Sequence, residues 1–167
     1  MSSPKLVQDV LKPPLRIPPP LVMLFLIAAG LSVHAFFPRL LLPEGWIQFV
    51  VGLPTVGLGI ALSGRSLKRF TLAGTDERYA EPTSVIVQDG LYARTRNPMF
   101  LGAVLIHLGV VLAVNAGWAL LGVPLFVLYL HFGVIRREEG FLERRFGEEY
   151  VTYTMRVPRW VPQLTDR

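Results

Sequence analysis

The stretch that decides the fold runs from Arg96-Asn97-Pro98-Met99-Phe100, through a long apolar run, to Arg136-Arg137-Glu138-Glu139. The apolar run is interrupted only by Asn115-Ala116-Gly117, whose residue types are typical of a tight turn. The two apolar halves therefore predict an antiparallel helical hairpin that brings both polar clusters to the same end. Ionisable groups at the mouth of an apolar bundle are costly to hold there, so the two clusters together predict a functional site.

The rest of the chain extends this pattern to four apolar stretches. The sequence is 51% hydrophobic and only 17% charged, with a mean hydropathy of +0.44. Each stretch has close to the roughly 17 residues that mark the lower limit of a membrane span, and none carries the polar stripe of a soluble bundle helix. We expect an all-α integral membrane protein with four transmembrane helices and a C-terminal cytoplasmic helical extension. The four stretches are Leu21–Phe37, Ile47–Ser63, Met99–Val114 and Trp118–Ile135.

These stretches divide the chain into five parts. A proline-rich arm over residues 1–20 precedes two membrane helices over 21–63, a loop over 64–97, the hairpin over 98–135, and a helix with a tail over 136–167. A signal peptide is the alternative for the first apolar stretch, but the preceding segment is rich in proline and no small-residue cleavage site follows. Gly52, Gly57 and Gly59 in the second stretch are interpreted as helix-packing contacts.

The distribution of basic residues predicts the topology. With four spans, sixteen of the 17 Lys and Arg residues fall on one side of the membrane and only Arg39 on the other. The positive-inside rule then places both termini in the cytoplasm. These charges flank the spans and meet lipid headgroups first, so we expect membrane lipids and no nucleic acid as partners. The chain has no cysteine, and its three scattered histidines are interpreted as packed residues rather than metal ligands.

Local signals on either side of the hairpin shape the expected site. Thr83–Val87 is β-branched and reads as a short extended piece whose backbone needs partners. Pro98 suits the first turn of a helix, and Asn97 before it suits an N-cap whose side chain bonds an orphan N–H. A helix continuing past Ile135 puts Glu138 at the border of an apolar arc and Glu139 inside it. That arc is formed by Leu142, Phe146, Tyr150 and Tyr153.

The two clusters suit a ligand with groups of both charges. Arg94, Arg96 and the N–H groups that open the third apolar helix favour an anion such as a carboxylate. Glu138 and Glu139 accept hydrogen bonds from hydroxyl or ammonium groups. S-adenosylmethionine carries a carboxylate, an ammonium group and a ribose, and its sulfonium suits carboxylates and tyrosine faces. The alternative at this point is that the Arg and Glu clusters simply pair with one another.

The order of short motifs resembles the isoprenylcysteine carboxyl methyltransferase family, which is related to phospholipid methyltransferases. The resemblance covers about residues 70–162 and combines three groups of residues in order. They are Val85-x-Val87-x-x-Gly90-x-Tyr92-x-x-x-Arg96-Asn97-Pro98-x-Phe100, then Glu138-Glu139, then Phe146-Gly147-x-x-Tyr150-x-x-Tyr153-x-x-x-Val157-Pro158. The first two apolar stretches resemble the family only in hydrophobicity.

This resemblance implies S-adenosylmethionine as the cofactor, in a cytosolic pocket above the hairpin. It implies backbone contacts from Ser84, Val85, Ile86 and Val87, and packing of Tyr92 on the cofactor. Asn97, Pro98, Met99 and Phe100 then hold the methionyl end, Glu138 is the acidic contact, and Phe146, Tyr150 and Tyr153 cover the pocket. On this basis we predict Arg96 and Glu139 as catalytic residues, and Arg136, Arg137 and Tyr150 as contacts of the substrate.

Two departures from the family pattern bear on the chemistry. Asn97 stands where the family has histidine, so this position cannot titrate near neutral pH. Val134 stands where the prenylcysteine enzymes carry a substrate-binding arginine, which disfavours a prenylcysteine carboxylate. We therefore expect a membrane methyltransferase with a lipophilic acceptor drawn from the bilayer. The alternatives are a non-catalytic scaffold or carrier and a membrane reductase of the sterol-reductase type that uses a nicotinamide cofactor.

Overall fold

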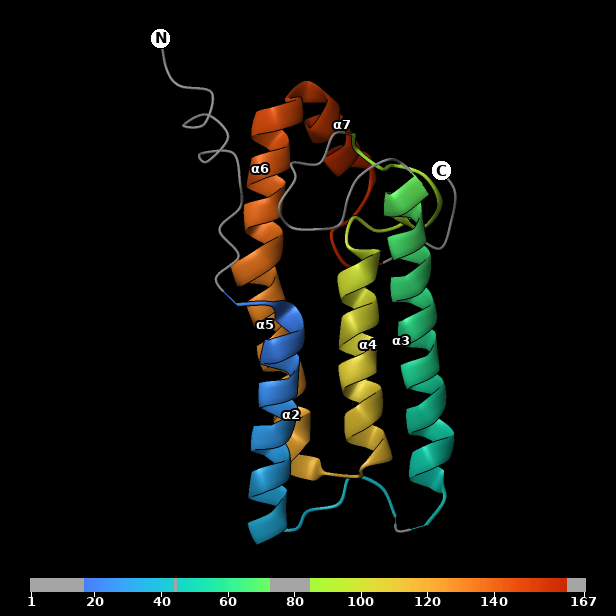
Figure 1. Cartoon of the computed structure of the whole chain (residues 1–167), viewed down its shortest axis with the longest axis vertical. Helices are drawn as coiled ribbons and strands as arrows, with labels where there is room; N and C mark the ends of the chain where they lie inside the picture. The colour runs from blue at the N-terminus through green and yellow to red at the C-terminus, as the bar shows by residue number, and fades with distance from the viewer. Residues whose placement is uncertain (1–16, 44, 73–84, 162–167) are drawn as a thin grey trace.

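A computed structural model describes residues 17–43, 45–72 and 85–161 of the chain, and every regular element in these ranges is helical. Figure 1 shows long helices running side by side, joined by short connections at the lower end. The α-helices are α2 (Pro19–Phe36), α3 (Ile47–Leu72), α4 (Pro98–Ala113), α5 (Gly122–Leu128), α6 (Arg136–Phe146) and α7 (Glu148–Arg156). Two short 3₁₀ turns, η1 (Gly90–Ala93) and η2 (Gly117–Leu121), precede α4 and α5.

The all-helical class expected from the sequence is confirmed for the described residues. Among the described residues, three helices are long and apolar enough to cross a membrane: α2, α3 and the continuous helix Gly117–Phe146. The remaining apolar helix, α4, has 16 residues and is shorter than these three. Most of the proline-rich arm and Ser84 fall outside the described residues, and Val85–Val87 form no regular element.

Small residues hold α3 directly against α4. A Cβ added to Gly59 would lie 2.6 Å from the carbonyl oxygen of Gly102, and one added to Gly109 would lie 2.6 Å from the backbone nitrogen of Val56. Such contacts require glycine, which lets two helix backbones approach closely in a membrane. The packing interpretation is confirmed for Gly59 and for Gly52, whose added Cβ would lie 2.5 Å from the backbone nitrogen of Ala113. It is wrong for Gly57, whose added Cβ would meet nothing within 4 Å.

The predicted turn between the two halves of the hairpin is present and also clamps the preceding loop. Asn115 adopts a φ of 54°, a left-handed conformation that asparagine tolerates better than most residues. Its side-chain oxygen accepts hydrogen bonds from the backbone N–H of Leu41 at 2.9 Å and of Leu42 at 2.8 Å, and its amide donates to the carbonyl of Leu42 at 2.9 Å. The turn thereby fixes the connection between α2 and α3.

The last long helix departs from the expected regular helix in two places. Residues Tyr129–Ile135 form a π-helical segment, η3, between α5 and α6; such segments are rare and often occur at functional sites. The helix then ends at Phe146, because Gly147 takes a φ of 55° and a new helix, α7, starts at Glu148. The expectation of one helix running from Ile135 through Tyr153 is therefore wrong. Tyr150 and Tyr153 reach the site by folding back rather than by helical periodicity.

Candidate functional site

The candidate site lies where the N-terminal end of α4 meets α6, α7 and residues 157–161, which we call the C-terminal segment. This segment bonds the backbone just before α4: Arg96 N–H donates to the carbonyl of Pro158 at 2.9 Å. The Thr95 hydroxyl donates to the carbonyl of Trp160 at 3.0 Å, and the Asn97 side-chain amide donates to the carbonyl of Arg159 at 3.0 Å. These bonds hold the C-terminal segment against the start of α4.

One sequence expectation is corrected by this arrangement. Pro98 occupies the first turn of α4 as predicted, and Asn97 stands at the N-cap position. Its side chain, however, makes no capping hydrogen bond to the helix, because the amide is used to bind the C-terminal segment. Asn97 is 8% exposed, so this bond also satisfies a polar group that burial would otherwise leave unpaired.

Glu139 is the centre of an ion cluster. Its carboxylate forms an ion pair with Arg96, whose Nη1 lies 2.9 Å from Oε1. It also accepts hydrogen bonds from Arg159 Nε at 3.0 Å and from Arg159 Nη2 at 2.6 Å. The side chains of Glu139 and Arg96 are only 14% and 13% exposed, and that of Arg159 is 33% exposed. The predicted meeting of the Arg and Glu clusters is present, and the carboxylate that makes these ion pairs is Glu139. Glu138 is half-buried and makes no ion pair within the described residues.

Two buried tyrosines of α7 cover the ion cluster. Tyr153 donates a hydrogen bond from its hydroxyl to the carbonyl of Tyr92 in η1 at 2.7 Å. Burial, with the nearby charge of Glu139, raises the pKa of Tyr150 to about 12, although Arg96 opposes the rise. Burial also raises the pKa of Tyr153. Both side chains therefore stay neutral hydrogen-bonding groups at physiological pH.

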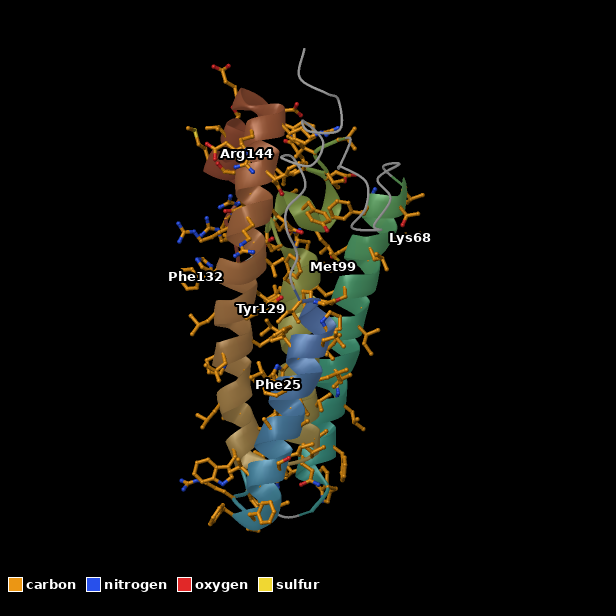
Figure 2. All side chains as sticks on the ribbon, turned by 60° about the vertical axis from the view of Figure 1, so that its left-hand side comes forward. Phe25, Lys68, Met99, Tyr129, Phe132 and Arg144 are labelled. Carbon is orange, nitrogen blue, oxygen red and sulfur yellow. The ribbon has the colours of Figure 1, made fainter. Side chains whose placement is uncertain are left out.

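The other predicted site residues are distributed between the cluster and its periphery. Pro98 and Phe100 are buried at the start of α4, Met99 beside them is half-buried, and Ile86 packs against Tyr150, Tyr153 and Val157. Val87 is half-buried and Val85 is exposed. Arg94, Arg136 and Arg137 are exposed. The guanidinium of Arg136 lies 5.8 Å from the ring centre of Phe132. Figure 2 shows Phe132 on the side of the last long helix that faces away from the other helices.

Three residues that were not predicted complete the cluster: His131, Arg159 and Trp160. The Trp160 indole N–H donates to Nδ1 of His131 at 3.1 Å, and Arg159 Nη1 lies 3.4 Å from Nε2 of the same ring. His131 comes from the π-helical segment, and the other two come from the C-terminal segment. In the sequence, Arg159 and Trp160 directly follow the Val157-Pro158 motif. Nothing in the local sequence, however, indicates that this motif folds onto α4.

Two groups in the cluster are suited to a bound zwitterion. The Nε atom of Arg96 is buried and has no hydrogen-bond partner among the described residues, so it is a donor available to an anion. Glu138 makes no ion pair within the described residues, because both arginines pair with the neighbouring Glu139, and it can accept a hydrogen bond from an ammonium or a hydroxyl group. The described residues contain no group of three or more His, Cys, Asp or Glu side chains placed to hold a metal ion.

Comparison with known proteins relates this region to membrane methyltransferases. The profile of the family described as phospholipid methyltransferase matches residues 47–149, more than half of the chain. An uncharacterized protein of Haemophilus influenzae is 41% identical over 63 residues, which cover 38% of this chain and all of that protein. The protein-S-isoprenylcysteine O-methyltransferase of Schizosaccharomyces pombe is 26% identical over 148 residues. That match covers 83% of this chain and 62% of the yeast enzyme. No solved structure matches the chain.

Proposed function

We propose, since the chain belongs to the phospholipid methyltransferase family, that it transfers a methyl group from S-adenosylmethionine to a lipophilic acceptor. The observation that carries this proposal is the polar cluster of Arg96, Asn97, Glu138 and Glu139 at one end of an apolar helical bundle. The matched region of the chain contains this whole group.

The free groups of the cluster fit the cofactor. We assign its carboxylate to Arg96 Nε and to the N–H groups that open α4, where a helix N-terminus favours an anion. Its ammonium or ribose hydroxyls are assigned to Glu138. Backbone groups of residues 85–87, with Tyr92 and residues 97–100, then surround it. Bound there, S-adenosylmethionine supplies a methyl group on a sulfonium, ready for direct displacement.

Catalysis in this proposal comes from positioning. Glu139 fixes Arg96 and Arg159 in one arrangement, and these groups hold the nucleophile of the acceptor in line with the methyl group. The tyrosines over the cluster exclude water from it. A carboxylate or thiolate acceptor needs no base, whereas an amine must lose a proton, and we assign no base. We therefore favour an acceptor that arrives ionised, in contact with Tyr150, Arg136 or Arg137.

The proposed topology has four spans, with α4 as the shortest, and both termini in the cytoplasm. In this arrangement α6, α7 and the C-terminal segment form the cytoplasmic face, where the basic residues gather. The acceptor approaches from the bilayer beside the last long helix. Binding of an apolar molecule from the lipid requires no transfer through water, which is consistent with a site built directly on apolar helices.

Calorimetry on the full chain in detergent tests the cofactor. S-adenosylmethionine and its demethylated product are expected to bind, and absence of binding at millimolar concentration would refute the proposal. Glu138→Gln is expected to weaken binding at least about tenfold, as one charge-assisted hydrogen bond predicts. Glu143→Gln is the matched control, because Glu143 lies on the same helix and is exposed.

The acceptor is tested by radiolabelled methyl transfer into a total lipid extract, beside a prenylcysteine analogue. We expect labelled lipid and little labelled prenylcysteine, since Val134 is buried and apolar where the prenylcysteine enzymes resembled here have an arginine. Methylation of the analogue alone would contradict this expectation.

A non-catalytic scaffold is the second candidate, and the ion pairs of Glu139 are the observation that favours it. A scaffold requires these pairs and has no use for Glu138. Loss of cofactor binding in Glu138→Gln with unchanged stability would therefore exclude a purely structural role for the cluster.

A further inference from the structure

His131 lies between two groups that can only donate hydrogen bonds. The Trp160 indole N–H points at Nδ1 from 3.1 Å, and the Arg159 guanidinium faces Nε2 from 3.4 Å. Indole nitrogen and guanidinium nitrogens have no acceptor capacity, and a neutral imidazole can accept at only one of its nitrogens. The ring therefore cannot satisfy both neighbours.

The distances select one tautomer. The shorter contact, from Trp160, is a normal hydrogen bond and requires Nδ1 to be the acceptor. In the neutral ring the proton then sits on Nε2, facing the N–H of Arg159. Two donors, one from His131 and one from Arg159, therefore face each other, and Arg159 Nη1 has no acceptor among the described residues.

The charge at this point is positive. Arg96 and Arg159 share the single carboxylate of Glu139, so these three groups carry one excess positive charge, and the adjacent Glu138 forms no ion pair with either arginine within the described residues. The Nε and Nη2 edge of Arg159 is occupied by Glu139, and Nη1 is the nitrogen turned to His131. The side chain of Arg159 is 33% exposed, so a ligand can reach it.

The residues around His131 and Arg159 are suited to bind the headgroup of a lipid. Trp160 packs against the apolar cluster of Phe126, Leu130 and Val134, and Phe132, next to His131, is 56% exposed. The first charged residue of this helix, Arg136, follows one turn later. His131 and Arg159 thus lie at the level where the apolar surface ends and polar headgroups begin.

We propose that Arg159 and His131 form a binding site for one oxyanion of a lipid headgroup, either a phosphodiester or a carboxylate. One oxygen accepts hydrogen bonds from both donors and balances the excess charge, while the acyl chains lie on the apolar helices. The site rests on the proposed function and deepens it, because Arg159 also orients the acceptor there, but it binds the lipid without a methyl donor. Failure of methylation therefore leaves it intact, and its own failure leaves cofactor binding intact.

Calorimetry on the full chain in a neutral detergent, without S-adenosylmethionine, tests the site. The probes are short-chain phosphatidylglycerol, decanoate, a short-chain diacylglycerol and inorganic phosphate. We expect an anionic lipid to bind at least about tenfold more tightly than the uncharged diacylglycerol. The tighter of phosphatidylglycerol and decanoate identifies the source of the oxyanion. Inorganic phosphate binding as tightly as either lipid would overturn the lipid assignment, and equal binding of charged and uncharged lipid would overturn the site.

Variants separate this site from a structural role. Arg159→Gln and His131→Leu are expected to abolish the preference for the anion, whereas His131→Gln keeps an N–H donor and is expected to restore most of it. Because Arg159 also holds Glu139, the ¹⁵N spectrum of His131 in the unaltered chain is the independent measurement. A protonated Nε2 that shifts on addition of the anionic lipid supports the proposal. A protonated Nδ1, or no shift, overturns it.

Discussion

Replacing Glu139 by glutamine tests the reasoning about the ion cluster most directly. The change keeps the shape of the side chain and removes its charge. In the unaltered chain the carboxylate accepts two hydrogen bonds from Arg159, at 3.0 Å and 2.6 Å, and forms an ion pair with Arg96 at 2.9 Å. Glutamine offers one oxygen, and its amide nitrogen faces donors. The variant therefore leaves Arg96, which is 13% exposed, without a countercharge.

The size of the effect follows from burial. Breaking a buried ion pair from one side costs about 3–5 kcal/mol. Arg159 is 33% exposed and water screens its loss, so we expect the lower end, about 3 kcal/mol. For a chain of this length that corresponds to a fall in the unfolding temperature of about 6–12 °C.

Thermal unfolding in detergent, followed by circular dichroism, measures the effect. Glu138→Gln is the matched control, because it makes the same chemical change at the neighbouring residue, which forms no ion pair within the described part of the chain. We expect it to unfold within about 2 °C of the unaltered protein, since substitutions away from such contacts cost little. Equal unfolding temperatures for the two variants would refute the assignment of the ion pairs to Glu139.

Three further predictions concern the framework and the tyrosines over the site. Asn115→Ala removes the three hydrogen bonds to Leu41 and Leu42 and puts alanine in a left-handed backbone conformation. We expect it to lower the free energy of unfolding by about 3 kcal/mol, measured in denaturant. Asn115→Gly is expected to lower it by less, because glycine adopts this conformation without strain. Gly102→Ala is expected to lower the free energy of unfolding by about 1–3 kcal/mol, because its Cβ would overlap α3. Gly57→Ala is the control and is expected to leave the free energy of unfolding unchanged, because its Cβ would meet nothing within 4 Å. Equal effects of the two substitutions would contradict the packing of α3 against α4. Folding raises the pKa of Tyr150 from 10.0 to about 12, so the unfolded state ionises first as the pH rises. The contribution of this hydroxyl to the free energy of unfolding is therefore fully present below about pH 10 and is lost as the pH rises toward 12. The free energy of unfolding of Tyr150→Phe is expected to fall less steeply over this range, and an unchanged slope would contradict burial of the hydroxyl.

Local patterns in the sequence were sufficient to predict the helical class and most helix positions. Apolar runs without polar stripes gave the helices, Pro98 marked the start of α4, and Asn115 marked the turn. These features depend on the backbone preferences of neighbouring residues and on the hydrophobicity of whole stretches. Both properties can be read from short segments of the sequence. The meeting of the Arg and Glu clusters followed from the same hairpin.

The choice of partners within the site depended on tertiary structure. Glu138 and Glu139 are adjacent and chemically identical. Only the resemblance to a known family predicted Glu138 as the cofactor contact and Glu139 as a catalytic residue. Which carboxylate meets Arg96 depends on the π-helical segment before it, since a change in helical pitch rotates every later side chain. The left-handed Gly147 likewise redirected Tyr150, which periodicity had placed on a continuous helix.

The C-terminal segment shows the same limit most clearly. Asn97 and Arg159 are 62 residues apart in sequence, and their hydrogen bond exists only once α6 and α7 have folded back over α4. From the local sequence, the Asn97 side chain was expected to cap α4. In the folded chain its amide bonds the carbonyl of Arg159 instead, because a buried amide bonds an acceptor that packing brings within reach. Sequence by itself determined that helices form and where their polar ends gather, since these are local and additive properties. Only the tertiary structure decided which polar atoms meet there, because that depends on how the segments pack together in space.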